Sequence, residues 1–476
     1  MFKEYDVLDH QEIQRIHDAS LRVLEETGIF LDHPKAQEVL SGLGAKISDD
    51  KKKVYLNRDL VEKLLARAPK SFKCAGRRPE LDLDMRQGNT YVRQVGGPIC
   101  LYDMRCSTTR PLTLQDNIDS ARLIDSLPHI DMSSALSPQD IDPETYDIAV
   151  VKALLENSNK HFWALTTHSS HLQYEMEMVE AVAGSKEKLR DRPSTSGIFC
   201  VIDPLRYPAD EIDRLLVYGD YGLPVRVPIT SLCGGNAPYT LAGTMVQINA
   251  EFLSSTAIIQ ALCPGLGIWY YTLLQTMDMN NGHSIATGPE IIILYSASAQ
   301  MARHYGVPAT FNSGALTDTQ SHQAMYHYGT MQMMAALLRI TEQCGAGSIQ
   351  AAAYYSHQAL VIINESMSYT RRIVEGFDIS PEAMAVDDIA AMADKGEYLS
   401  SKLTLKSLRT EKRFKPTVLD WRTLSTWTSD PTTIVDRAEA EAQRLIAKAV
   451  PPEMPADIQR ELDKIMKAAQ REFSKA

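Results

Sequence analysis

Six aromatic side chains fall near the ends of apolar segments that predict β-strands, where an α/β barrel places its chemistry. They are Trp269, Tyr270, Tyr271, Phe311, Tyr354 and Tyr355. A quaternary ammonium has no N–H to donate and is bound by aromatic faces, at about 0.5–2 kcal/mol per contact. Because successive strand residues point to opposite faces, some of these rings must fill the core. The rings that we expect to line a cage for a small cation are Trp269, Tyr271, Phe311, Tyr354 and Tyr355.

Amide and imidazole donors accompany these aromatic residues. Asn312, Gln350 and His357 are candidate substrate-binding residues, and Asn236 is a further donor. The same loops carry no obvious Arg or Lys clamp, which would suit a longer or more strongly charged anion. A compact carboxylate can be held by neutral donors.

A zinc site is an alternative at the same end of the strands. His168 and His171 lie three residues apart in TTHSSH, and Asp203 follows the next predicted strand. Two histidines and a carboxylate can hold a catalytic zinc ion, as in barrel hydrolases. The simpler interpretation is a solvent-facing loop in which Ser169 or Ser170 caps a helix.

A glycine-rich turn at 233–236 separates a strand from a helix. Gly234 and Gly235 follow the apolar run PVRVPITSL, and PYTLAG opens the next helical segment. Glycine allows backbone angles that a Cβ would forbid, and a proline is well placed at a helix start. Cys233 could act as a nucleophile at this helix N-terminus, or it is a small apolar residue at the strand end.

The chain alternates between strands and helices from about residue 113 to 375, which predicts a (β/α)8 TIM-like barrel. An open parallel sheet is the second choice. Seven strand–helix pairs are clear, and the eighth strand is either irregular or lies at the start of the 113 region. The predicted strands are 129–136, 161–167, 195–202, 225–232, 265–271, 307–313 and 346–353.

Three regions follow from this pattern. Residues 1–112 predict an N-terminal part with helices near 9–28, 33–43 and 57–67 and a β-rich stretch after them. Residues 113–390 form the predicted barrel domain. Residues 391–476 predict an irregular segment and a charged helical tail that packs on the barrel or on a neighbouring subunit, so we expect a homo-oligomer.

Composition excludes several classes of function. The chain has 476 residues, 44% hydrophobic content and a formal charge of -11. An acidic balance argues against nucleic acid as a partner, and no apolar run reaches a membrane span. The N-terminus lacks the apolar core of a signal peptide, so we expect a cytoplasmic protein. Seven scattered cysteines without a C-x-x-C motif fit reduced thiols.

Three long segments resemble the trimethylamine methyltransferase family. They are LRVLEETGIFLDHPKAQEVLSGLGAKI near the N-terminus, CGGNAPYTLAGTMVQINAEFLSSTAIIQ at 233–260 and ATGPEIIILYSASAQMARHYGVPATFNSGALTDTQ at 286–320. The resemblance covers roughly residues 9–390. It implies an enzyme that moves a methyl group from an amine to the corrinoid (cobamide) of a separate partner protein, with no cofactor bound tightly by the chain itself.

The chain departs from the archaeal trimethylamine enzymes, which carry pyrrolysine in the loop after the sixth strand. Here that loop contains Asp318 and Gln320 and no such residue. Without it, the resemblance implies a substrate that is already activated for methyl loss. A quaternary amine is such a substrate, and glycine betaine is the first candidate among the betaines. The alternatives are a zinc-dependent barrel hydrolase and a betaine-binding barrel without turnover.

Overall fold

The computed structural model describes residues 5–164, 166–313, 322–350, 352–410 and 413–473. Asp318 and Gln320 lie outside the described residues. Eight parallel strands form a closed ring, because β13 pairs with β14 and joins the two ends of the sheet. This confirms the barrel and excludes the open sheet. The barrel strands are β6 (Tyr91–Gln94), β9 (Met132–Ser134), β10 (His161–Trp163), β11 (Thr195–Ile198), β13 (Val225–Cys233), β14 (Ile268–Met277), β16 (Ala309–Asn312) and β17 (Glu342–Ala346).

The first barrel strand, β6, lies before residue 113, where the barrel was expected to start. It ends at a Gly96-Gly97-Pro98 turn, and a hairpin then separates it from its helix, α4 (Leu114–Ser126). The hairpin strands are β7 (Cys100–Asp103) and β8 (Thr108–Pro111). This insertion hides the first strand–helix pair in the sequence.

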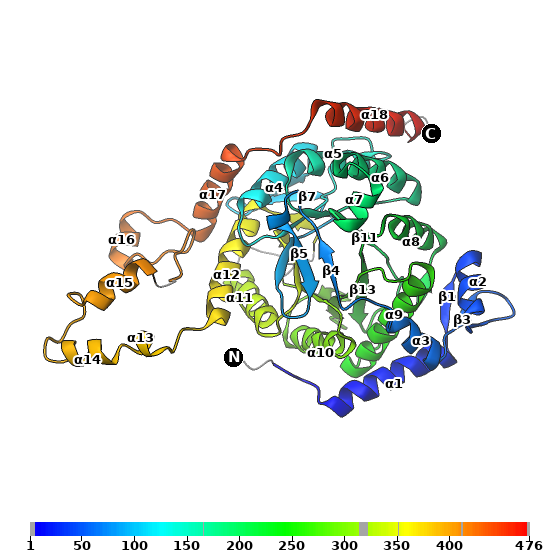
Figure 1. Ribbon diagram of the computed structural model, residues 1–476, viewed down its shortest axis with the longest axis horizontal. Coiled ribbons are helices and arrows are strands. Elements are labelled where there is room, and N and C mark those ends of the chain that lie inside the picture. Colours follow the sequence, from blue (N-terminus) through cyan, green and yellow to red (C-terminus); the bar gives the residue numbers. More distant parts are fainter. Residues whose placement is uncertain (1–4, 165, 314–321, 351, 411–412, 474–476) are drawn as a thin grey trace.

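Helices surround the barrel (Figure 1). They are α5 (Tyr146–Asn157), α6 (Ser169–Ala183), α7 (Lys186–Asp191), α8 (Ala209–Tyr221), α9 (Leu241–Leu262), α10 (Pro289–Tyr305), α11 (His322–Leu337) and α12 (His357–Glu375). Gly222 ends α8 and Gly306 ends α10, each in the left-handed region. A glycine there ends the helix without a Cβ clash, so the chain can turn directly into the next strand.

The N-terminal helices pack on the outside of α9. They are α1 (His10–Glu26), α2 (Pro34–Gly42) and α3 (Arg58–Leu65), and they match the helices expected near 9–28, 33–43 and 57–67. A small sheet of β1 (Ile29–Leu31), β2 (Lys46–Ile47), β3 (Lys53–Tyr55) and β12 (Arg206–Tyr207) joins this region to the barrel. This cover explains why α9 is apolar on nearly all sides.

A second hairpin, β4 (Ser71–Cys74) and β5 (Leu83–Arg86), lies across the amino end of the barrel (Figure 1); a short 3-10 turn, Pro79–Leu81, precedes β5. Its residues Cys74, Leu83 and Met85 are buried in one apolar cluster with Trp269 of β14. The ring of Phe72 meets Trp269 edge-on, with centroids 4.5 Å apart. The hairpin therefore seals the barrel at the amino end.

The C-terminal region returns to the barrel surface. α17 (Ile434–Lys448) packs on α12 and α4, and α18 (Ala456–Phe473) packs on α5 and α6. Between α12 and α17 the chain projects away from the barrel (Figure 1). That part holds α13 (Pro381–Met384), α14 (Val386–Met392), α15 (Lys402–Thr410) and α16 (Leu424–Ser429). Within the described residues, no helix has the length and apolar character needed to cross a membrane.

Trp269 lies at the sealed end of the barrel, which gives a first prediction. Its side chain is 0% exposed. Trp269→Ala should lower the free energy of unfolding by about 3–5 kcal/mol, because it leaves a cavity under the hairpin. Urea denaturation measures the loss, and the exposed Tyr326→Ala serves as the control. A variant as stable as the native chain would contradict the sealed position of Trp269.

Candidate active site

The inner face of the barrel follows from the strand register. Residues paired in neighbouring parallel strands point to the same face, and alternate residues point to opposite faces. Arg226 pairs with Trp269, and Thr310 pairs with both Tyr271 and Glu342. These side chains therefore point toward the barrel axis.

A buried layer of two arginines and one glutamate crosses this interior. Arg93 of β6 donates to Glu342 of β17 from Nε at 2.7 Å, and Arg226 of β13 donates to Glu342 from Nη2 at 2.8 Å. All three side chains are at most 1% exposed. The remaining donors are also used, since Arg93 reaches Ser134 and Arg226 reaches Ser196. This layer is the floor of the open part of the barrel.

The floor carries one excess positive charge. Burial opposes ionisation of Glu342, but the charges of Arg226 and Arg93 outweigh it and lower the pKa of Glu342 to about 2. Burial also favours the neutral form of His161, which contacts Ser196 at 2.9 Å, and lowers its pKa to about 3. Two guanidiniums therefore face one carboxylate.

The side chains of Trp163 and Tyr271 also lie inside the barrel and contact Arg93 of the floor. The Arg93 guanidinium lies 4.7 Å from the Trp163 ring centroid and 5.7 Å from that of Tyr271. The Tyr271 hydroxyl accepts from Arg93 Nη2 at 3.2 Å and from the Cys344 thiol at 3.6 Å. Trp163 is the last residue of β10, so it lies at the carboxyl end of the barrel.

Beyond these rings, solvent reaches the inner face. Thr230 of β13 is exposed, and it pairs with the half-buried Leu273 of β14. Asn312, the last residue of β16, is also half-buried and follows Thr310 on the inner side. The barrel is therefore sealed at its amino end and open at its carboxyl end, where barrel enzymes bind their substrates.

The strand boundaries change two expectations about the aromatic residues. The strand expected at 265–271 runs to Met277, because the apolar and β-prone residues after Tyr271 extend it. Trp269 is therefore near the start of β14, not at its carboxyl end. The strand expected at 346–353 lies earlier, at Glu342–Ala346, and a short β18 (Ser348–Ile349) follows.

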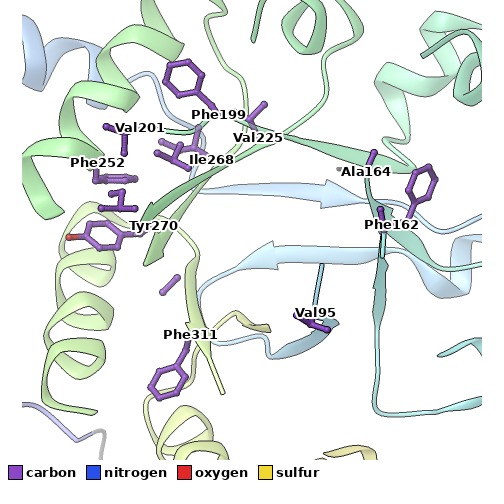
Figure 2. Close-up of a cluster of buried hydrophobic side chains, with 14 of the residues drawn as sticks. Val95, Phe162, Ala164, Phe199, Val201, Val225, Phe252, Ile268, Tyr270 and Phe311 are labelled. Carbon is purple, nitrogen blue, oxygen red and sulfur yellow. The ribbon is translucent and has the colours of Figure 1, made fainter. Parts of the chain in front are cut away.

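Phe311 points away from the inner face. It stacks on Tyr295 of α10 with ring centroids 4.2 Å apart. Figure 2 shows Phe311 and Tyr270 directed toward the helices outside the strands. Of the candidate residues on β14 and β16, the inner face therefore holds Trp269, Tyr271 and Asn312.

The candidates after β17 form a separate group beside the β7–β8 hairpin. Strand β19 (Tyr354–Tyr355) pairs with β7. The buried Tyr355 hydroxyl lies 2.8 Å from Ser120 of α4, and its ring meets His357 edge-on at 5.2 Å. Tyr354 is half-buried against Tyr102, and Gln350 is exposed. Within the described residues, no hydrogen bond or ring contact joins this group to Trp163 or Tyr271.

The side chain of Asn236 holds the glycine turn in place through two hydrogen bonds. The Asn236 side chain donates to the Thr230 carbonyl at 2.8 Å and accepts from the Leu232 amide at 2.6 Å. Cys233 is 1% exposed and contacts Thr244 of α9, on the outer side of β13. The turn therefore shapes the open end of the barrel, and Cys233 is part of the core.

Of the residues of the zinc alternative, His168 and His171 lie together, with ring centroids 5.3 Å apart, but the side chains of His171 and Asp203 have different partners. Nδ1 of His171 lies 3.0 Å from Asp147, and Ser231 donates to Asp203 at 3.2 Å. In the part of the chain that the structure describes, no group of three His, Cys, Asp or Glu side chains could hold a metal ion. The geometry does not support a zinc hydrolase.

Sequence reasoning missed Arg93, Trp163, Arg226 and Glu342. Each stands in a strand segment beside β-prone residues, as in TYVRQV and PVRVPI. A charged residue inside an apolar strand is a signal, because burial of a charge requires a partner. The partner could not be read from the sequence, since Arg93 and Glu342 are 249 residues apart.

The comparisons with known proteins agree with this architecture. The family described as "Trimethylamine methyltransferase (MTTB)" matches residues 1–474. The chain is 28% identical over 467 residues to a glycine betaine methyltransferase of Desulfitobacterium hafniense (strain Y51), covering 97% of this chain and 96% of that protein. It is 25% identical over 470 residues to the trimethylamine methyltransferase MttB of Desulfitobacterium hafniense (strain DSM 10664 / DCB-2), covering 98% and 94%.

A solved structure shows the same fold. The monomethylamine methyltransferase MtmB of Methanosarcina barkeri aligns with a TM-score of 0.55 over 100% of this chain and 89% of that chain. The sequence identity is 11%. This likeness supports the barrel and its additions, and it says nothing about substrate.

A buried carboxyl next to the open end gives a second prediction. Glu175 of α6 is 0% exposed and accepts from Thr166 at 2.6 Å. Burial, aided by the charge of Asp147, raises the pKa of Glu175 to about 8. The folded chain therefore keeps a proton that the unfolded chain releases above about pH 4.5. As the pH rises between these two values, this group lowers the free energy of unfolding by about 1.4 kcal/mol per pH unit.

Glu175→Gln should remove this loss. Urea unfolding at pH 5.5, 6.5 and 7.5 should show that the variant gains stability relative to the native chain as the pH rises. Glu177→Gln on the same helix is the matched control and should follow the native curve. Parallel curves for Glu175→Gln and the native chain would show that the carboxyl is not held protonated.

Proposed function

Because this chain belongs to the trimethylamine methyltransferase family, we propose that it transfers a methyl group from a small betaine to the reduced corrinoid of a separate protein. Glycine betaine is the first candidate donor. The chain is a methyltransferase by family, and its relatives include enzymes named for glycine betaine and for trimethylamine. The choice between these donors rests on the barrel interior.

The positively charged floor carries the proposal. Two arginines and one glutamate leave a unit charge below Trp163 and Tyr271. A carboxylate at roughly 7 Å from that charge gains about 2 kcal/mol at an effective dielectric constant near 20. A methylated ammonium is repelled by the same charge. A betaine therefore enters with its carboxylate toward the floor and its methyl groups toward the open end, whereas protonated trimethylamine has nothing to offset the repulsion.

The arginine donors are already used by Glu342, Ser134 and Tyr271. The carboxylate would therefore meet a neutral donor next to the floor. The candidate is the Trp163 indole N–H, which is buried and has no hydrogen-bond partner within the described residues. Thr230 and Asn312, which lie farther out on the inner face, would then face the methylated end.

Methyl loss from a quaternary amine needs no acid. The C–N bond breaks as the acceptor attacks the methyl carbon in line, and the leaving nitrogen keeps the electron pair and becomes neutral. The chain's own residues then have three tasks: they bind the carboxylate, hold the ammonium and exclude water. The sealed floor and the hairpin beneath it perform the third.

An apolar rim at the open end supports a protein partner. Ile99, Ile202, Tyr239 and Met279 are exposed. They lie on the segments that follow β6, β11, β13 and β14. A partner that covers this rim would bring its corrinoid to the substrate and close the barrel to solvent.

Methyl transfer is measured with the full chain, chemically reduced cobalamin as acceptor and either glycine betaine or trimethylamine as donor. We expect absorbance changes of corrinoid methylation and dimethylglycine as product with glycine betaine, and neither with trimethylamine. Turnover of trimethylamine without turnover of any betaine would refute the proposal. Saturable betaine binding in calorimetry with no methyl transfer would instead support a barrel that only binds betaines.

Arg93→Met tests the role of the floor. It removes the excess charge and leaves Arg226 and Glu342 as a neutral pair. A loss of about 1.4–2 kcal/mol corresponds to a KM for glycine betaine that is about 10–30-fold higher. Arg93→Lys keeps the charge and should retain most of the affinity. Equal losses in the two variants, with unchanged thermal unfolding, would show that charge does not set the affinity.

A further inference from the structure

The segment from Gly376 to Asp430, here called the arm, leaves the barrel after α12 and projects from the molecule (Figure 1). It contacts α12 again near its end, where the amides of Thr417, Val418 and Leu419 donate to Glu365. Helices α13, α15 and α16 contain no buried residue, and α14 buries only Met392. The arm therefore has almost no core within the described chain, so its helices depend on contacts outside one subunit.

The arm exposes many large apolar side chains. They are Phe377, Ile379, Met384, Val386, Ile389, Tyr398, Leu399, Leu405, Leu408, Trp421, Leu424 and Trp427. Phe377, Leu399 and Leu408 are 84%, 85% and 76% exposed. Together the twelve expose on the order of 1,000 Å², which exceeds the usual apolar patch of a monomer and matches one side of a standard protein interface.

A groove divides the arm. It has a volume of about 610 Å³ and is lined by Phe377, Glu382, Leu403 and Lys406 among others. The lining residues come from the end of α12, from the segment between α12 and α13, from α13 and from α15. The groove offers an apolar floor between acidic and basic edges, so it can receive a helix of similar composition.

The charges of the arm are divided between its two halves. Residues 376–400 contain six carboxylates and one lysine, whereas residues 401–416 contain six basic side chains and one glutamate. Two copies related by a twofold axis place the acidic half of each against the basic half of the other. A symmetric interface requires such self-complementarity, because the same surface is used on both sides.

We propose that the arm is a subunit interface, and that two copies of this chain associate by pairing their arms in opposite directions. The apolar side chains form the centre of the contact, and the opposite charges fix its register. This dimer does not depend on the substrate or on the methyl acceptor. It also leaves the open end of the barrel accessible to a partner.

Sedimentation of the full chain tests the proposal. We expect a species of twice the chain mass of 53.0 kDa. Leu399→Ser with Leu408→Ser should raise the dissociation constant of the dimer at least about 30-fold, since both side chains are exposed in one subunit and their loss costs a single subunit little. Val450→Ser, at a side chain 84% exposed outside the arm, is the matched control. Unchanged thermal unfolding of a dissociated form shows that the variant folds.

Charge reversal tests the pairing itself. Glu382→Lys with Asp387→Lys changes the formal charge of residues 376–400 from -5 to -1, and Lys402→Glu with Lys406→Glu changes that of residues 401–416 from +5 to +1. Each variant alone should be monomeric, and an equimolar mixture should form heterodimers. A native chain that is monomeric at all concentrations, an assembly that the leucine variants leave intact, or a mixture that stays monomeric would each overturn the proposal.

Discussion

The rest of the barrel depends on the buried contact of Arg93 and Arg226 with Glu342. It joins three strands, β6, β13 and β17, from opposite parts of the sequence. Removal of Glu342 would leave two guanidiniums without compensation in a dry interior, which costs several kcal/mol. Such a layer requires protection from water on the amino side, and the β4–β5 hairpin supplies it. The floor and the hairpin are therefore one structural unit.

Strand β14 shows how one segment builds both ends of the barrel. Its inward residues are Trp269, Tyr271 and Leu273, in that order toward the carboxyl end. Trp269 packs on the hairpin, Tyr271 contacts Arg93, and Leu273 is partly open to solvent. Because side chains alternate between the two faces of a strand, these three residues all point toward the barrel axis. The position of each along the strand decides whether it supports the fold or faces a ligand.

The sequence predicted the barrel well because its strands and helices alternate with clear punctuation. It predicted the site poorly for two physical reasons. The length of β14 was underestimated, so Trp269 and Tyr271 were placed at the wrong end of their strand. The ion pairs between distant strands also could not be read from local pattern, so Arg93 and Glu342 were absent from the candidates. Tyr271 and Asn312 lie on the inner face of the barrel, and their role in substrate binding stays a prediction.

Under the proposed function, the floor charge acts on the reaction as well as on binding. The substrate nitrogen is positive before methyl transfer and neutral after it. A fixed positive charge at roughly 10 Å disfavours the cation by about 1.7 kcal/mol at an effective dielectric constant near 20, and this penalty disappears as the C–N bond breaks. About 1.4 kcal/mol corresponds to a tenfold change in rate. The betaine carboxylate offsets this penalty in the bound state. A donor that carries its own carboxylate can therefore bind near a positive charge that favours the neutral amine product.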